Sequence, residues 1–488
     1  MQNERKGSIM LKKFRCRNPI KLLSDDEIQD IHNQTLQVLE EVGLYFEDED
    51  ALGILEQNGC IIDKKKGLAR IPNHLVEKSI SQCPPSFTLK GRNQDNAVVF
   101  DRETLQFGPC SGMRIMDILS GKLRPGTADD AIRTARLADA LDIMAGVNIG
   151  LGFISDRPVE INLVWNYVIC CRNSGKVFSL GAMEDSVKWG IRIAEVSEQD
   201  IIIPVSSTSP LGWSAEQILA VKQAAKSNRP VTIQSMASPG ITAPITLSGT
   251  AVVMNAEILG MLVLAQILKP GSGVIYSCFT LPMDMRLGTL ASGSIELAML
   301  TVISAQLSKF YRIGSMIWGP NTDSKAYDEQ CGYEKAMQWL LAAQAGINLI
   351  WGAGMIENHT IWSDEQLIVD AEICERVGRY LDGIDTGGGS SNFETIKEVG
   401  HFPGNYLMQP QTLKDLSKEH YIPTVSSRHD YDSWKKLKPR DLMGRAESIA
   451  SKVIDQHEAP ALSPAADKEV ENILFAAAKE KGLESPYL

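Results

Sequence analysis

Short apolar runs alternate with amphipathic helical patterns along most of this chain. From about Gln106 the alternation becomes regular, with intervals of roughly 30–45 residues, the spacing expected of consecutive βα units. The eight apolar runs predict strands that end near Gly108, Ile149, Leu180, Ser206, Gln234, Cys278, Met316 and Ile350. Eight βα units within about 280 residues predict an α/β fold of the (β/α)8 TIM barrel class.

An open, doubly wound sheet is the alternative architecture for such a pattern. It is disfavoured because no glycine-rich dinucleotide turn follows the first predicted strand. In a parallel barrel the carboxyl ends of all strands lie on one face, and that face carries the chemistry. We therefore expect the functional residues just after the predicted strand ends, above all between Arg312 and Glu372.

Three of the predicted helices have clear start signals. These are Thr127–Asp130, Ser214–Gln217 and Ser363–Gln366, each with a hydroxyl residue followed three positions later by an acidic or amide residue. This spacing predicts a capping box, in which the two ends satisfy free backbone N–H groups reciprocally. Each predicted capping box marks the residue at which the helix begins.

The regions on either side of the regular pattern are predicted to be additions to the barrel. Residues 1–104 contain an arm, a helix opening at Ser24 and short strands, which predict an N-terminal helical cap region. The barrel is assigned to residues 105–385. Residues 386–488 change to polar loops and further helices, which predict a C-terminal helical extension packed on the barrel.

Charge and hydrophobicity exclude some classes of binding partner. The net charge of −11 argues against a nucleic-acid partner and against an anionic membrane surface. The most apolar segment, around Ile258–Leu268, is too short and too interrupted to predict a membrane span. Nine scattered cysteines are typical of a reducing compartment, so we expect a cytoplasmic protein.

Common metal and cofactor motifs are absent from the sequence. No Cys-x-x-Cys, His-x-His or His-Glu-x-x-His occurs, so no metal site is expected. The stretch Asp30–Thr35 lacks the glycine of a corrinoid-ligating turn and falls inside a predicted helix, so no tightly bound cofactor is expected. Lys176 and Lys325 are poorly placed for a Schiff base, which disfavours a lyase built on a barrel.

Aromatic residues gather at the predicted strand ends, although only 6% of the chain is aromatic. Rings that converge at a barrel mouth can form a cage for a quaternary ammonium group, because each ring face carries negative electrostatic potential. The alternative is that each ring caps the hydrophobic core on its own. The residues concerned are Phe107, Phe153, Trp213, Phe279, Trp318 and Trp351.

We predict a substrate site made of Phe279, Trp318 and Trp351, with Arg286 or His359 holding an anionic group. The three rings belong to the sixth, seventh and eighth strands, which are neighbours in such a barrel. An arginine fork matches a carboxylate with two hydrogen bonds. The alternatives are that Arg286 is a surface residue and that His359 only orders its loop.

Several long motifs resemble those of the trimethylamine methyltransferase family. They are Gln234–Gly249, Asn255–Gly260, Thr322–Lys325, Asp328–Glu334 and Gly352–Gly354, and the resemblance covers nearly the whole chain. The resemblance implies a (β/α)8 barrel that moves a methyl group from an amine to the Co(I) corrinoid, or cobalamin, of a separate corrinoid protein. It therefore implies a cognate corrinoid protein as partner; we also expect a homo-oligomer.

One departure from the family pattern changes the expected substrate. Members that use trimethylamine carry pyrrolysine after the seventh strand, whereas Trp318–Gln330 holds only ordinary residues here. The chain therefore resembles the non-pyrrolysine branch, which implies demethylation of glycine betaine to dimethylglycine. Proline betaine, carnitine or another betaine are alternatives, and so is a non-catalytic subunit that binds betaine or docks the corrinoid protein. A quaternary ammonium needs no acid, since its leaving group is already a neutral amine.

Overall fold

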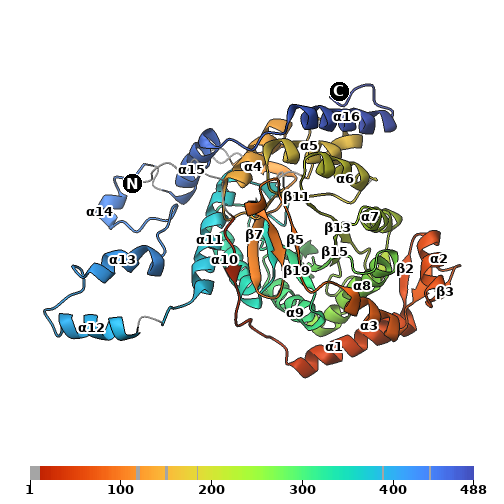
Figure 1. The fold of residues 1–488 in the computed structure, drawn as a ribbon, viewed down its shortest axis with the longest axis horizontal. Coiled ribbons are helices and arrows are strands. Elements are labelled where there is room, and N and C mark those ends of the chain that lie inside the picture. The colour runs from red at the N-terminus through yellow and green to blue at the C-terminus, as the bar shows by residue number, and fades with distance from the viewer. Residues whose placement is uncertain are drawn as a thin grey trace.

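A core of parallel strands surrounded by helices forms the centre of the protein in the computed structural model (Figure 1). The structure describes residues 11–116, 121–148, 152–183, 185–386, 389–438 and 441–487. The central strands are β7 (Thr104–Pro109), β10 (Gly146–Val147), β11 (Val177–Ser179), β12 (Ile201–Ile202), β13 (Pro204–Ser206), β15 (Val231–Ser235), β16 (Val274–Cys278), β19 (Gly314–Trp318) and β20 (Leu349–Ala353).

These strands form two hydrogen-bonded sheets. The larger has the order β1-β7-β20-β19-β16-β15-β13, and the smaller has the order β10-β11-β12. Every pair is parallel except β1 (Phe14–Arg15), which runs antiparallel to β7. The predicted α/β class is therefore confirmed.

Most predicted strand ends are close to the observed ones. Seven of them lie within three residues of the end of a described strand. The eighth, Ile149, lies outside the described residues; the strand before it, β10, ends at Val147. The prediction works because β15, β16 and β20 are buried along their whole length, so each reads as a continuous apolar run.

Helices follow the central strands and cover them. They are α4 (Ala128–Ala140), α5 (Asn162–Asn173), α6 (Val187–Val196), α7 (Ala215–Lys226), α8 (Leu247–Leu268), α9 (Ile295–Tyr311), α10 (Glu329–Ala345) and α11 (Asp364–Asp382). Within the described ranges only α8 is long and apolar enough to cross a membrane, and 83% of its most apolar window is buried in the protein. Such burial is typical of the core helix of a globular protein.

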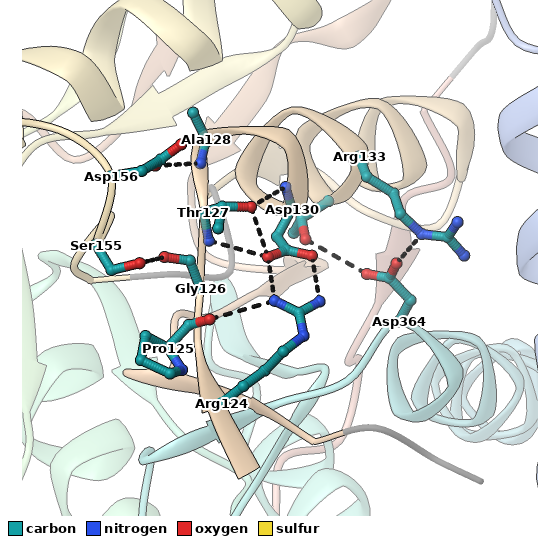
Figure 2. A network of polar contacts seen from close by, with 11 residues as sticks. Arg124, Pro125, Gly126, Thr127, Ala128, Asp130, Arg133, Ser155, Asp156 and Asp364 are labelled. Carbon is teal, nitrogen blue, oxygen red and sulfur yellow. Dashed lines mark hydrogen bonds and ion pairs between the residues drawn. The ribbon is translucent and has the colours of Figure 1, made fainter. Parts of the chain in front are cut away.

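The three predicted capping boxes have different outcomes. The box at α4 is confirmed, with Thr127 and Asp130 bonded reciprocally (Figure 2). At α11 only half is present, because the Ser363 hydroxyl accepts a bond from the Gln366 N–H while the Gln366 amide binds Asp370. The box at α7 is wrong. Ser214 makes no side-chain cap, and Gln217 instead bonds the backbone of Ser206 and Ala182.

The N-terminal region adds helices and a small sheet to one side of the core. Helix α1 (Asp25–Gln37) begins at a Ser24–Glu27 capping box, as the sequence predicts from Ser24, and packs with α3 (Asn73–Gln82) on α8. Helix α2 (Glu49–Gln57) lies beside a sheet of order β14-β2-β4-β3. The strands of this sheet are β2 (Leu44–Phe46), β3 (Ile61–Asp63), β4 (Leu68–Arg70) and β14 (Gly212–Trp213).

The C-terminal region has two different parts. Helices α15 (Leu442–Gln456) and α16 (Pro464–Glu480) pack on the body, α15 against α4 and α11 and α16 against α5 and α6. Helices α12 (Gly389–Val399), α13 (Pro410–Glu419) and α14 (Tyr431–Trp434) stand away from the central strands beyond α11 (Figure 1).

Candidate functional site

Two tryptophans meet at the carboxyl ends of neighbouring strands. Trp318 ends β19 and is paired in register with Trp351 of β20, and their ring centroids are 5.2 Å apart at an interplanar angle of 84°. Trp351 is completely buried. A Cβ atom added to Gly108 would lie 1.6 Å from Trp351 Nε1, and one added to Gly146 would lie 2.7 Å from Trp351 Cζ2. The two glycines therefore make room for the Trp351 ring, which supports Trp318 from within the core.

A second ring pair lies beside this one. The rings of Phe279, just after β16, and His359, in the loop after β20, are 5.0 Å apart at 72°. The Nε2 atom of His359 is 3.2 Å from the position of a Cβ on Gly319, the residue that follows Trp318. The structure thus brings four of the five predicted site residues together: Phe279, Trp318, Trp351 and His359.

Arg286 is the predicted residue that stands apart. It lies in the hairpin of β17 (Met283–Asp284) and β18 (Thr289–Leu290), and its side chain is 87% exposed. Asp284 binds its guanidinium with two oxygens, at 3.0 and 2.7 Å. This fork lowers the pKa of Asp284 to about 2. The arginine is therefore engaged at the surface, which does not match the role predicted for it.

His359 is present as a neutral imidazole. Burial, assisted by the charge of Lys335, lowers the pKa of His359 to about 3. Its Nδ1 is 3.5 Å from Cys110 Sγ, and its Nε2 is buried without a hydrogen-bond partner. The imidazole can therefore offer one neutral hydrogen bond at Nε2, but it cannot hold a carboxylate as a cation.

A half-buried, neutral histidine makes the protein sensitive to acid. Because the folded pKa is below the ordinary value near 6.5, only the unfolded chain takes up this proton as the pH falls between the two values. We expect the parent to lose about 2 kcal/mol more stability between about pH 7 and pH 5 than His359→Gln does. Urea unfolding at both pH values measures this difference, with exposed His420→Gln as the control. Equal losses in parent and His359→Gln would contradict it.

A cavity of about 460 Å³ opens next to Trp318. It lies at the carboxyl ends of β7, β10 and β11, and its volume is in the range of small-molecule sites. Its two charged lining residues, Glu160 and Lys481, are both exposed. The other walls are mostly apolar and include Trp318, Phe153, Met113, Met183, Leu163 and Asn166.

The remaining strand-end aromatics divide between cavity and core. Phe153 lines the cavity. Phe107 and Trp213 are completely buried, and Phe107 packs against Trp339 with ring centroids 5.5 Å apart. The interpretation of strand-end rings as core caps therefore holds for Phe107 and Trp213, while Phe153 and Trp318 face the cavity.

A polar network fixes the loop that carries Phe153 (Figure 2). The Ser155 hydroxyl donates to the Gly126 carbonyl at 2.7 Å, and Asp156 accepts from the Ala128 N–H at 2.8 Å. Arg124 binds the Asp130 carboxylate with two nitrogens, at 2.6 and 2.7 Å. The network ties the loop after β10 to the start of α4 and so holds one wall of the cavity.

A buried ion pair holds the two loops at the tryptophans. Lys335 Nζ and Asp370 Oδ2 are 3.0 Å apart, and both side chains are fully buried. The same ammonium donates to the carbonyls of Gly352, at 3.0 Å, and Met355, at 2.8 Å. A Cβ on Gly352 would lie 2.6 Å from the backbone of Pro320, so glycine allows the two loops to touch. The pair thus joins the chain after β19 to the chain after β20.

A second buried carboxylate orders the other side of the strand ends. Glu257 of α8 accepts hydrogen bonds from the hydroxyls of Ser207, Ser209 and Ser235 and from the Leu211 N–H, at 2.6–2.9 Å. Burial raises the pKa of Glu257, and these donors partly offset the rise. Ser235 and Glu257 belong to the motifs Gln234–Gly249 and Asn255–Gly260, which places those motifs at this network.

One further polar residue lies beside Gly319. Asn321 is completely buried, and both its side-chain oxygen and its nitrogen lack a protein partner. Its Cβ is 3.6 Å from the position of a Cβ on Gly319, which also lies near His359 Nε2. Buried amides are ordinarily hydrogen-bonded, so these two unpaired atoms are unusual. Neither Asn321 nor His359 is among the residues that line the cavity beside Trp318.

The profile of the trimethylamine methyltransferase (MTTB) family matches residues 2–483 of this chain. The chain belongs to the trimethylamine methyltransferase family. It is 31% identical over 477 residues to the glycine betaine methyltransferase of Desulfitobacterium hafniense strain Y51, across 95% of this chain and 98% of that protein. It is 30% identical to the trimethylamine methyltransferase MttB of D. hafniense strain DSM 10664 / DCB-2, across 89% of each chain. The solved monomethylamine methyltransferase MtmB of Methanosarcina barkeri aligns over 92% of each chain, at 14% identity and a TM-score of 0.46.

Some features of this site can be recognised in the sequence of this trimethylamine methyltransferase family member, and others cannot. The ring pairs follow from aromatics at strand ends. The sequence does not reveal Lys335 and Asp370, because the two side chains meet only in the folded protein, or Asn321, whose side chain has no protein partner. A lysine inside the largely apolar helix α10 is the one local signal of a buried pair. Across the described ranges no group of three or more His, Cys, Asp or Glu side chains is placed to hold a metal.

Proposed function

We propose that this chain moves a methyl group from a quaternary amine, with glycine betaine as the first candidate, to the Co(I) corrinoid of a separate protein. The observation that carries the proposal is the arrangement around Trp318, a ring that faces a small apolar cavity beside neutral hydrogen-bonding groups. Membership in the family supports methyl transfer, and the 31% identical relative named for glycine betaine supports the substrate class.

We infer that the two sheets form one (β/α)8 barrel. At one junction the Ala145 N–H donates to the Phe107 carbonyl, and Phe107 and Met144 form a parallel bridge. At the other, β12 and β13 are separated only by Ile203, whose carbonyl accepts from the Thr232 N–H of β15. Both contacts support a continuous ring, which places the cavity and the ring pairs at its carboxyl-end mouth.

In the proposed complex the ammonium group lies against the face of Trp318. Phe153, which lines the same cavity as Trp318, and Phe279, which follows the neighbouring strand β16, are candidates for further rings, while Trp351 supports Trp318 from within the core. The betaine carboxylate is bound by neutral donors, the Nε2–H of His359 and the amide of Asn321; both residues lie within 4 Å of the position of a Cβ on Gly319. Arg286 keeps its fork with Asp284 at the surface.

The proposed reaction requires the protein mainly to position the substrate. The methyl–nitrogen bond breaks with both electrons left on nitrogen, and a neutral tertiary amine departs, so no proton moves. This suits the site, because a histidine with a pKa of about 3 cannot serve as an acid at neutral pH. The residues hold one methyl group toward the mouth and keep water away from it.

The proposal requires the corrinoid protein to reach the mouth, and the rim offers an apolar surface for it. Exposed apolar side chains lie on the loops after five of the central strands. Such a group marks an interaction surface more often than a solvated one. The residues are Met113, Phe153, Val159, Met183, Ile241, Ile245, Met285 and Leu287.

A panel of methylamines tests the substrate class. Purified protein is mixed with Co(I) cobalamin and one of glycine betaine, proline betaine, carnitine, choline or trimethylamine, and methyl-Co(III) absorbance is followed. We expect turnover of at least one quaternary amine and none of trimethylamine, because Trp318–Gln330 holds only ordinary residues where family members that use trimethylamine carry pyrrolysine. Trimethylamine turnover at a rate comparable to that of the best betaine would contradict the proposal.

A further inference from the structure

The cavity beside Trp318 extends from the ends of the central strands into the outer layer of helices. Trp318 and Ser179, at the ends of β19 and β11, line it on the side of the strands. Tyr167 and Cys170 of α5 and Trp189 of α6 line it on the side of the helices, and each of these three side chains is at most 8% exposed. The cavity therefore reaches well below the surface on which a partner protein could dock.

The cavity is larger than a simple betaine requires. Its volume of about 460 Å³ falls within the range of about 300–1,000 Å³ that is typical of sites for drug-sized ligands. Glycine betaine is a much smaller molecule, and in the proposed complex its ammonium group lies at Trp318, so most of the cavity stays free. Apolar voids of this size are uncommon in closely packed protein interiors. The free part has room for a further apolar group of the substrate.

One polar side chain in the wall of the cavity has no partner. Asn162, Asn166 and Cys170 stand at positions i, i+4 and i+8 of α5, which places them on one face of the helix. Asn162 is bonded twice to the backbone of Ile154, at 2.8 and 2.9 Å. Asn166 is 8% exposed, its side-chain oxygen is buried without a partner, and no described residue accepts from its nitrogen. Since buried amides are ordinarily hydrogen-bonded, Asn166 offers one polar contact to a ligand in this cavity.

The charges of the cavity restrict what that ligand group can be. Glu160 and Lys481, the two charged lining residues, are both exposed, so the buried walls carry no charge. An ionised group placed against these walls would lose its hydration without gaining a counter-ion. An uncharged chain with one hydrogen-bonding atom matches the walls, because the chain meets apolar side chains and the atom meets the Asn166 amide.

We propose that the preferred substrate of this site is a betaine that carries an acyl chain, as an O-acylcarnitine does. This inference rests on the proposed function and specifies its substrate further. The ammonium group lies at Trp318, the acyl carbonyl accepts a hydrogen bond from the Asn166 amide, and the alkyl chain fills the space beside Cys170 and Trp189. Glycine betaine makes only the first of these three contacts.

Calorimetric titration of the full-length protein with carnitine and its butyryl, hexanoyl and octanoyl esters tests the inference. No cobalamin is added, so binding is measured apart from methyl transfer. Each methylene group that enters the cavity should lower the dissociation constant about fourfold, about 0.8 kcal/mol. We expect octanoylcarnitine to bind at least about a hundredfold more tightly than carnitine.

Two variants locate the chain. Cys170→Phe fills the part of the cavity beside α5 and should abolish the gain with chain length while keeping the affinity for carnitine. Asn166→Leu should weaken hexanoylcarnitine about tenfold, about 1.4 kcal/mol, and leave carnitine unchanged. The matched control is Asn173→Leu, the same substitution at the last residue of α5, which does not line the cavity and should bind like the parent. Circular dichroism checks the fold of each variant, and Asn166→Leu keeps the test available if Cys170→Phe does not fold.

Equal affinities for carnitine and octanoylcarnitine would overturn the inference and leave the proposed function intact. A gain with chain length that persists unchanged in both Cys170→Phe and Asn166→Leu would also overturn it, because the chain would then lie outside this cavity. Failure of every compound to bind, glycine betaine included, would overturn the proposed function together with the inference.

Discussion

Replacing Lys335 by methionine should lower the free energy of unfolding by about 3–5 kcal/mol. The side chain is fully buried, and its ammonium group serves the Asp370 carboxylate and the carbonyls of Gly352 and Met355. Methionine fills most of the volume but removes the ammonium partner of the carboxylate, which keeps only the neutral donors Gly354 N–H and the Gln366 amide, and it removes the bonds of Lys335 to both carbonyls. Removing one partner of a buried ion pair lowers the stability by more than the intact pair contributes to it, because the other charge is left buried and unpaired.

Urea unfolding followed by tryptophan fluorescence measures this loss, provided that the m-value stays the same. The control is Lys21→Met, which removes an exposed ion pair with Asp25 and should change the stability by less than about 1 kcal/mol. Lys335→Met should also reduce activity, since Lys335 joins the loops after β19 and β20. A Lys335→Met protein as stable as Lys21→Met would show that the pair does not hold these loops.

Replacing Trp318 by alanine should raise the apparent dissociation constant for the quaternary amine about thirtyfold. A cation–π contact in a dry site is worth about 2 kcal/mol, and about 1.4 kcal/mol is a factor of ten. Trp318→Phe keeps a ring in place and should lose only a small part of this affinity. The loss in Trp318→Ala should be similar for betaines and for choline, because the ring recognises the ammonium group and not the carboxylate.

Binding and turnover of both variants measure the effect, with Trp434→Ala as a control at a tryptophan of α14. His359→Gln gives a complementary readout, since loss of the neutral Nε2 donor should weaken betaines and spare choline. If Trp318→Ala binds and turns over the substrate like the parent, the ammonium group lies elsewhere at the mouth, and Phe153 is then the first residue to test.

The strands could be predicted because parallel strands buried on both faces leave long apolar runs in the sequence. The side-chain partners could not, since they depend on residues brought close only by folding. Gln217 has the spacing of a capping residue, but its side chain is hydrogen-bonded to the backbone of Ser206 and Ala182 instead. Arg286 follows a strand end as a carboxylate-binding residue would, yet Asp284 two positions earlier takes its guanidinium.

The two tryptophans also show that the sequence does not determine which side chains reach a ligand. Trp318 and Trp351 occupy equivalent strand ends, and the sequence gives them equal standing as cage residues. In the structure the two rings differ: Trp351 lies in the core, where the glycines at positions 108 and 146 leave room for it, and Trp318 faces the cavity. Only the packing of neighbouring strands distinguishes the ring that can meet a ligand from the ring that supports it.

The most direct test of the proposed function follows the methyl group itself. Glycine betaine with deuterated N-methyl groups is incubated with the protein and Co(I) cobalamin, and both products are analysed by mass spectrometry. We predict one deuterated methyl group on cobalt for each dimethylglycine formed. Binding of the betaine without any methyl-Co(III) or dimethylglycine, across all the betaines of the panel, would contradict the account and leave a binding subunit in its place.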